Sequence, residues 1–135
     1  MISFSLNWLA VVAATVAAMI VGYVWYSMGV FGKAWMTVIG KTQEELKKDM
    51  GPAMGGMLVT AFLEMLVLGT VLKAFAPDGT YQAVVDGIWI WLGFVATIMF
   101  GGILFEHRSA KLFWINSGYH LVNIVIGTII LTMWK

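Results

Sequence analysis

The sequence predicts an all-α membrane protein with four transmembrane helices in a single domain, residues 1–135. The first observation is composition: 61% of the 135 residues are hydrophobic and 11% are charged, whereas a typical soluble domain has about 45–50% and about 25%. The second is that the apolar residues fall in four long stretches. The third is that each stretch is apolar all around a helix, without the period-two alternation of a membrane β-barrel. A soluble domain of this length could not bury so much apolar surface.

The four predicted spans cover approximately residues 5–28, 52–75, 82–105 and 111–134. Each is longer than the roughly 20 apolar residues that cross a hydrocarbon core of about 30 Å, and a helix satisfies its own backbone groups in lipid. Residues 1–7 contain no Lys or Arg. Because the first apolar stretch is also longer than a signal-peptide core, we expect the first span to be retained.

Basic residues gather at one end of the spans. Lys33, Lys41, Lys47, Lys48, Arg108 and Lys111 lie at that end, and Lys73 and Lys135 lie at the other. Because cytoplasmic loops carry the excess of Lys and Arg, the first and third loops are predicted to be cytoplasmic and both termini extracytoplasmic.

The first cytoplasmic loop is predicted to hold a short amphipathic helix. Thr42 and Glu45 have the spacing of a capping box, in which two side chains satisfy free backbone amides of the first helical turn. Leu46 and Met50 would then rest on the membrane surface while Lys47 and its charged neighbours face water.

Two internal matches suggest that the spans form two tandem helical hairpins. Trp8-Leu9 recurs as Trp91-Leu92, and LVLGTVL at 66–72 resembles IVIGTII at 124–130. Duplication of a hairpin would explain both matches, as a parallel repeat because both copies begin on the same side. Chance similarity between apolar segments is the alternative.

Small residues recur at every fourth position on two spans, which lets another helix approach closely. They are Ala10, Ala14, Ala18 and Gly22 on the first span, and Gly93 and Gly101, with Thr97 between them, on the third. The partner helix can belong to the same chain or to a second copy, and we expect a homo-oligomer.

Five polar residues of the second and fourth spans are predicted to meet near the middle of the bilayer. They are Thr60, Glu64, Asn116, His120 and Asn123. At 1.5 Å per residue, Glu64 lies roughly 18 Å from the start of its span, and His120 and Asn123 bracket the same depth. A charged carboxylate there costs about 2.5–3.5 kcal/mol even on the lowest scale, so Glu64 must face protein or water.

Two interpretations of this cluster are open. A hydrogen bond between Glu64 and His120 would fasten two helices, or the pair would line a path for a proton or a solute. Asp86, near the extracytoplasmic surface, is either a solvated residue or part of a pore mouth. Glu106 and Arg108 lie at the cytoplasmic end of the third span, where Arg108 can bind Glu106 or a lipid phosphate.

Composition and motifs also argue against several classes of protein. A net charge of +1 with no basic stripe argues against a nucleic-acid partner. The sequence has no cysteine, which excludes disulfides, thiolate catalysis and cysteine-ligated metals. No phosphate-binding glycine loop, HExxH motif or serine-nucleophile elbow is present. We therefore expect no enzymatic activity, no cofactor and no metal, with the lipid bilayer as a partner.

Five segments of the sequence resemble one family. They are NWLAV at 7–11, GYVWYS at 22–27, FGKAWM at 31–36, LFE at 104–106 and INSGYHL at 115–121. They resemble an uncharacterised bacterial membrane family, domain of unknown function 1761. The resemblance covers nearly the whole chain and implies four spans in a bacterial inner membrane, without an assigned activity. Met28 departs from it, because proline is expected there.

The resemblance adds a second set of candidate site residues. It comprises Trp25, Tyr26, Ser27, Glu106, Asn116, Tyr119 and His120, and it leaves out Glu64. The favoured hypothesis is a small homo-oligomeric inner-membrane protein that moves a small solute or ion. The alternative is a non-transporting structural or accessory protein whose polar cluster only fixes helix packing. An intramembrane enzyme is less favoured because no nucleophile–base pair is evident.

Overall fold

The computed structural model describes residues 5–134, and this part of the chain is helical without strands. The elements are α1 (Trp8–Trp25), α2 (Gly32–Ile39), α3 (Gln43–Lys48), α4 (Met50–Phe75), α5 (Thr80–Trp91), the π-helical segment η1 (Leu92–Ala96), α6 (Thr97–Glu106) and α7 (Ala110–Met133). Because α5, η1 and α6 follow without a break, they form one long helix, here called the third span. Four helices are therefore long and apolar enough to cross a membrane, as the sequence predicts.

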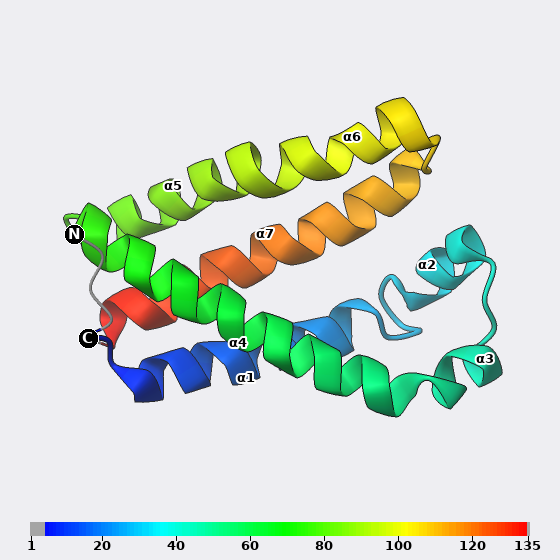
Figure 1. Cartoon of the computed structure of the whole chain (residues 1–135), viewed down its shortest axis with the longest axis horizontal. Coiled ribbons are helices and arrows are strands. Elements are labelled where there is room, and N and C mark those ends of the chain that lie inside the picture. The colour runs from blue at the N-terminus through cyan, green and yellow to red at the C-terminus, as the bar shows by residue number, and fades with distance from the viewer. Residues whose placement is uncertain (1–4, 135) are drawn as a thin grey trace.

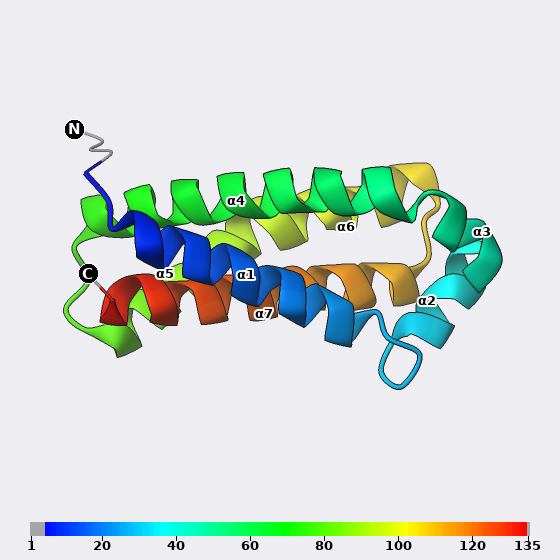
Figure 2. The ribbon, with the colours of Figure 1, turned by 90° about the horizontal axis from the view of Figure 1, so that it is seen from below.

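The four long helices form an antiparallel bundle (Figures 1 and 2). The start of α1, the end of α7 and the α4–α5 connection lie at one end, and α2, α3 and the α6–α7 connection lie at the other. The central helix is α7, which contacts α1, α4 and α5. In its most apolar window 44% of the residues are buried, against 6% in the third span. The third span is thus attached mainly along α5 and leaves most of its surface for lipid or another protein.

The contacts agree with two hairpins, since α1 packs on α4 and α5 packs on α7. The recurrence of Trp8-Leu9 as Trp91-Leu92 gives less support to the idea that one hairpin is a duplicate of the other. Trp8 is the first residue of α1, whereas Trp91 is the last residue of α5, in the middle of the third span. The two tryptophans therefore lie at different depths.

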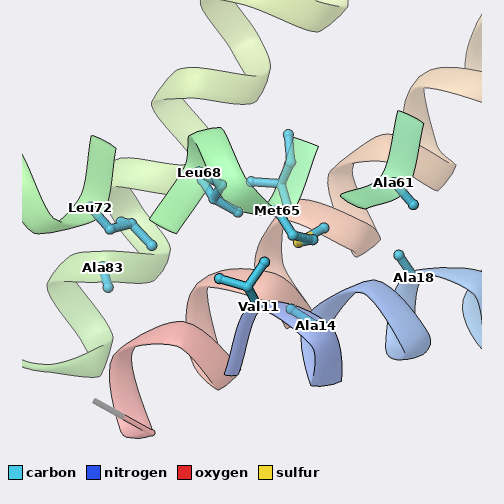
Figure 3. Close-up of a cluster of buried hydrophobic side chains, with 9 residues drawn as sticks. Val11, Ala14, Ala18, Ala61, Met65, Leu68, Leu72 and Ala83 are labelled. Carbon is cyan, nitrogen blue, oxygen red and sulfur yellow. The ribbon is translucent and has the colours of Figure 1, made fainter. Parts of the chain in front are cut away.

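The small residues of α1 face helices of the same chain. Ala10, Ala14 and Ala18 are buried, and Figure 3 shows Ala14 and Ala18 on the side of α1 that faces Met65 and Ala61 of α4. The core between α1, α4, α5 and α7 consists of Val11, Ala14, Ala18, Ala61, Met65, Leu68, Leu72, Ala83 and Ile124. The strip on α1 therefore packs against helices of the same chain.

Gly93 and Gly101 behave differently. A Cβ atom built on either would meet no neighbouring atom of the described chain within 4 Å. The closest helix approaches instead use glycines that the periodic strips do not contain. A Cβ on Gly127 would lie 2.6 Å from Met65 Sδ, and one on Gly87 would lie 2.7 Å from Thr128 Cγ2.

The first connection contains two short helices rather than the single one that the sequence predicts. Half of the expected capping box is present in α3: Thr42 Oγ1 accepts a hydrogen bond from the Glu45 amide at 3.2 Å, while Glu45 Oε1 accepts from the Thr42 hydroxyl and not from its amide. Helix α2 was not expected. It ends at Gly40, whose φ of 70° is the left-handed conformation that glycine adopts at helix ends. Trp35 of α2 packs edge-on against Tyr26, with ring centroids 5.0 Å apart.

Candidate functional site

The polar residues of α7 divide between two sides of the helix. Consecutive residues of an α-helix point about 100° apart. The rings of Tyr119 and His120 touch, with centroids 5.1 Å apart, but beyond this contact the two side chains face different helices. Tyr119 packs over Gly22 of α1, whereas His120 lines a cleft with residues of α4 and of the third span. The five residues of the predicted cluster consequently do not form one group.

The first group joins the end of α1 to α7 and is here called the fastening group: Trp25, Tyr26, Asn116 and Tyr119. Trp25 Nε1 donates to the Ile115 carbonyl at 2.9 Å, and Tyr26 Oη donates to Asn116 Oδ1 at 2.6 Å. Burial raises the pKa of the Tyr26 phenol above its ordinary value of 10.0, because the phenolate would lose its hydration. The hydroxyl therefore keeps its proton and remains a donor.

Tyr119 is the deepest member of the fastening group. Its side chain is buried, and its Oη lies 3.0 Å from the position that a Cβ on Gly22 would occupy. The rings of Tyr26 and Tyr119 meet edge-on at 5.3 Å, and the Asn123 side chain interacts with the Tyr119 phenol. The missing side chain at Gly22 thus leaves room for the Tyr119 ring, and not for the backbone of a neighbouring helix.

The second group lines a cleft of about 590 Å³ between α4, α7 and the third span. Its polar residues are Thr60, Glu64 and His120, and this set is here called the cleft group. The remaining walls are apolar: Leu63, Val67, Leu68, Val71, Ile90, Phe94, Val95, Ile98, Met99 and Ile124. The structure therefore brings together three of the five predicted residues and places Asn116 and Asn123 elsewhere, toward Tyr26 and Tyr119.

Glu64 has an unusual position in the cleft group. Its Oε1 atom is buried and has no hydrogen-bond partner, as is also true of Ser117 Oγ and Asn123 Oδ1 on α7. Glu64 is the ionisable residue of these three, and neither of the two ion pairs found among residues 5–134 includes it. The expected hydrogen bond with His120 is not formed at this oxygen, although both residues line the same cleft. Thr60 uses its proton locally, donating to the Met57 carbonyl at 3.1 Å. Glu64 also lies close enough to Tyr119 for the two groups to interact electrostatically.

The π-helical segment forms part of the opposite wall. Here the Thr97 amide bonds to the Leu92 carbonyl, five residues back, and Phe94 and Val95 line the cleft. Single π turns inside α-helices occur often at functional sites. No proline or polar residue marks this turn in the sequence, so the sequence does not predict it.

The other predicted site residues lie outside both groups. Asp86 Oδ1 accepts a bond from the Gln82 side chain at 2.9 Å, one turn away on the same helix. Glu106 and Arg108 form an exposed ion pair of 2.7 Å, so Arg108 binds Glu106. Ser27 Oγ donates to the Val24 carbonyl at 2.6 Å and so ends α1. Within the described residues, no three His, Asp or Glu side chains gather as metal ligands would.

No curated protein and no solved structure matches the chain. The family described as "Protein of unknown function (DUF1761)" matches residues 9–132. This match includes both polar groups and all of the four spans except their outermost residues, Trp8 and Met133. The chain is therefore a member of the DUF1761 family, and within it this chain has four helices long and apolar enough to cross a membrane.

Proposed function

We propose that this protein moves a small solute or ion across the membrane and that Glu64 binds it, or binds a proton coupled to it. Two observations carry the proposal: the Glu64 side chain lines an open cleft, and its buried Oε1 has no hydrogen-bond partner within the chain. In an apolar setting, a carboxyl group without a partner is costly. It is stabilised when it takes up a proton or when a cation arrives, and releasing either restores the first state.

The alternative, a protein in which polar groups only fix the packing, fits the fastening group better than the cleft group. Buried polar groups that serve packing are normally hydrogen-bonded. Tyr26 and Asn116 meet that expectation with a bond of 2.6 Å between α1 and α7. Glu64 does not, since its buried oxygen joins no other helix.

Oligomerisation is part of the proposal. The cleft opens sideways, between α4 and the third span, so one chain alone does not enclose a route across the bilayer. The third span has most of its surface free, with open positions at Gly93 and Gly101, and small residues on an apolar helix favour association in lipid. A second copy packed there would close the open side of the bundle.

We further propose that the chain lies in a bacterial inner membrane with its lysine-rich first loop in the cytoplasm. The excess of basic residues at that end supports this orientation. Because the chain has no cysteine, single cysteines can replace Lys47 and Asp78 at opposite ends of the bundle. A membrane-impermeant thiol reagent added to intact cells should label D78C and spare K47C until the cells are opened. The reverse pattern would invert the proposed orientation.

Proton flux in proteoliposomes tests the function directly. Purified protein is reconstituted with a pH-sensitive dye inside the vesicles, and flux is followed after a pH step across the membrane. We expect Glu64→Gln to lower the rate at least tenfold, because the amide cannot take up and release a proton. Glu44→Gln, an exposed carboxylate on α3, is the matched control and should keep the wild-type rate.

Two results would count against the proposal. One is a wild-type rate equal to that of protein-free vesicles, and the other is equal rates for E64Q and the wild type. A hydrophobic carbodiimide provides an independent measurement, since it reacts with protonated carboxyl groups in apolar surroundings. Mass spectrometry should find the adduct on Glu64 and not on Glu44.

A further inference from the structure

The cleft is polar at one end and apolar along the rest of its length. Thr60 and Glu64 lie one turn apart on α4, and the lining continues along the same helix to Val71. At 1.5 Å per residue, the stretch from Glu64 to Val71 is roughly 10 Å long. On the facing wall, Ile90, Phe94 and Ile98 give a similarly apolar surface. The shape suits a molecule with a compact polar head and an unbranched apolar tail.

The charge of the cleft defines the chemistry of that head. Glu64 and His120 are the titratable residues of its lining, and no Lys or Arg lines it. The two ion pairs found within residues 5–134, Lys41–Glu45 and Glu106–Arg108, lie elsewhere. A ligand that satisfies the buried Oε1 of Glu64 must therefore bring its own donor, and a positively charged donor makes the stronger bond with a carboxylate.

The side of the molecule on which the cleft opens defines the route of the ligand. Leu63 and Val67 on α4, and Phe94 and Ile98 on the third span, are at least half exposed. All four line the cleft and belong to helices that cross the bilayer. A ligand thus reaches Glu64 from the hydrocarbon region of the membrane and not from a water-filled vestibule.

We propose that the cleft binds a single-chain lipophilic amine taken from the bilayer. Its ammonium group donates to Glu64, and the Oγ1 of Thr60, whose own proton is directed to Met57, accepts a second bond. Its tail lies along Val67 and Val71 against the π-helical segment. The proposal rests on the proposed function and names the class of solute that the same site takes.

Binding of matched probes tests this class. Protein in nanodiscs of zwitterionic lipid is titrated with radiolabelled dodecylamine or dodecanol, with empty nanodiscs as background. The two probes share the tail and differ in the charged head. We expect dodecylamine to bind one per chain, with a Kd at least tenfold lower than that of dodecanol.

Variants then assign the binding to the cleft. Glu64→Gln should remove the tenfold preference for the amine, and Glu44→Gln should keep it. Val67→Trp should lower the binding of both probes, because the indole fills the cleft from an exposed wall position. An unchanged preference in E64Q, equal binding of the two probes, or unchanged binding in V67W would each overturn the proposal.

The test separates this inference from the proposed function. If E64Q loses proton flux but the wild type shows no preference for dodecylamine, the transport function stands and the ligand class is wrong. If the amine binds as expected and the wild type carries no proton flux, the ligand class stands and the transport function fails. A cleft filled by a second copy of the chain would exclude both probes and would likewise overturn the ligand class.

Discussion

The fastening group and the cleft group use the same helix, α7, for opposite purposes. On the side of α1, Tyr26 and Asn116 share a bond of 2.6 Å, and Trp25 bonds to the α7 backbone. On the side of α4, Glu64 has a buried oxygen with no partner beside a cleft of about 590 Å³. A hydrogen-bonded pair stabilises the fold, whereas a buried group without a partner costs free energy until a proton or a ligand satisfies it. Neighbouring positions on one helix can therefore differ completely in role.

The largest expected effect concerns the turn that leads out of the fastening group. A Cβ on Gly32 would lie 2.3 Å from the Tyr26 carbonyl oxygen and 2.7 Å from that of Ser27. Because these are backbone atoms, Gly32→Ala must open the turn, at a cost of about 1–3 kcal/mol. Thermal unfolding in detergent, followed by tryptophan fluorescence, should show the loss. Gly29→Ala in the same turn, with nothing within 4 Å, should unfold like the wild type.

A smaller effect is expected from the bond at the centre of the fastening group. Tyr26→Phe removes the donor to Asn116 Oδ1 in a partly buried bond, and a typical intramolecular hydrogen bond contributes about 0.5–1.5 kcal/mol. Tyr23→Phe makes the same chemical change at an exposed position of the same helix and is the control. Amine binding in the cleft should be the same in both variants. A Y26F protein as stable as Y23F would show that this bond does not fasten α1 to α7.

The stability of the Glu64→Gln variant distinguishes the cleft group from the fastening group. Because Oε1 of Glu64 forms no hydrogen bond, the amide loses no helix-to-helix contact, and we expect a change in unfolding free energy of less than about 0.5 kcal/mol. The same unfolding measurement as for Y26F gives the value. A loss as large as that of Y26F would move Glu64 into the fastening group and would remove the basis of the transport proposal.

The smallest effect on the fold is expected at Gly93. A Cβ atom at this exposed position would meet no atom of the described chain within 4 Å, so the Gly93→Leu monomer should unfold within about 0.5 kcal/mol of the wild type. If the third span packs on a second copy, Gly93→Leu should lower the oligomeric fraction seen by native mass spectrometry. Gly56→Leu, also open and on α4, should leave it unchanged. If Gly93→Leu and the wild type have equal oligomeric fractions, the contact between copies does not involve Gly93 and lies on another face of the bundle.

The sequence predicts the four spans well because length and hydropathy determine which helices can cross a bilayer. Helical spacing also predicts which residues of α1 share a face, and Ala10, Ala14 and Ala18 are buried together. The main element that the sequence does not predict is α2, an eight-residue helix between a tight turn and Gly40. Gly40 at its end is the signal that could have indicated it.

The composition of the site was harder to predict, for a geometric reason. Counting residues along a helix gives depth in the membrane, and Glu64 and His120 do line one cleft. Depth does not tell which neighbour a side chain faces, and that depends on how α7 sits between α1, α4 and α5. Asn116 and Asn123 therefore face Tyr26 and Tyr119 instead. The role of Gly22 beneath Tyr119 follows from the same packing.

The π-helical segment has a consequence for how the length of the chain can vary. Hydrogen bonds that reach back five residues, as from Thr97 to Leu92, hold one residue more than an α-helical turn. Deleting a residue between Leu92 and Ala96 lets the turn become α-helical while α5 and α6 keep their directions. Deleting one elsewhere in an α-helix rotates every later side chain by about 100°. In the π-helical segment, the third span can therefore lose one residue while the side chains after it keep the same orientation toward α7.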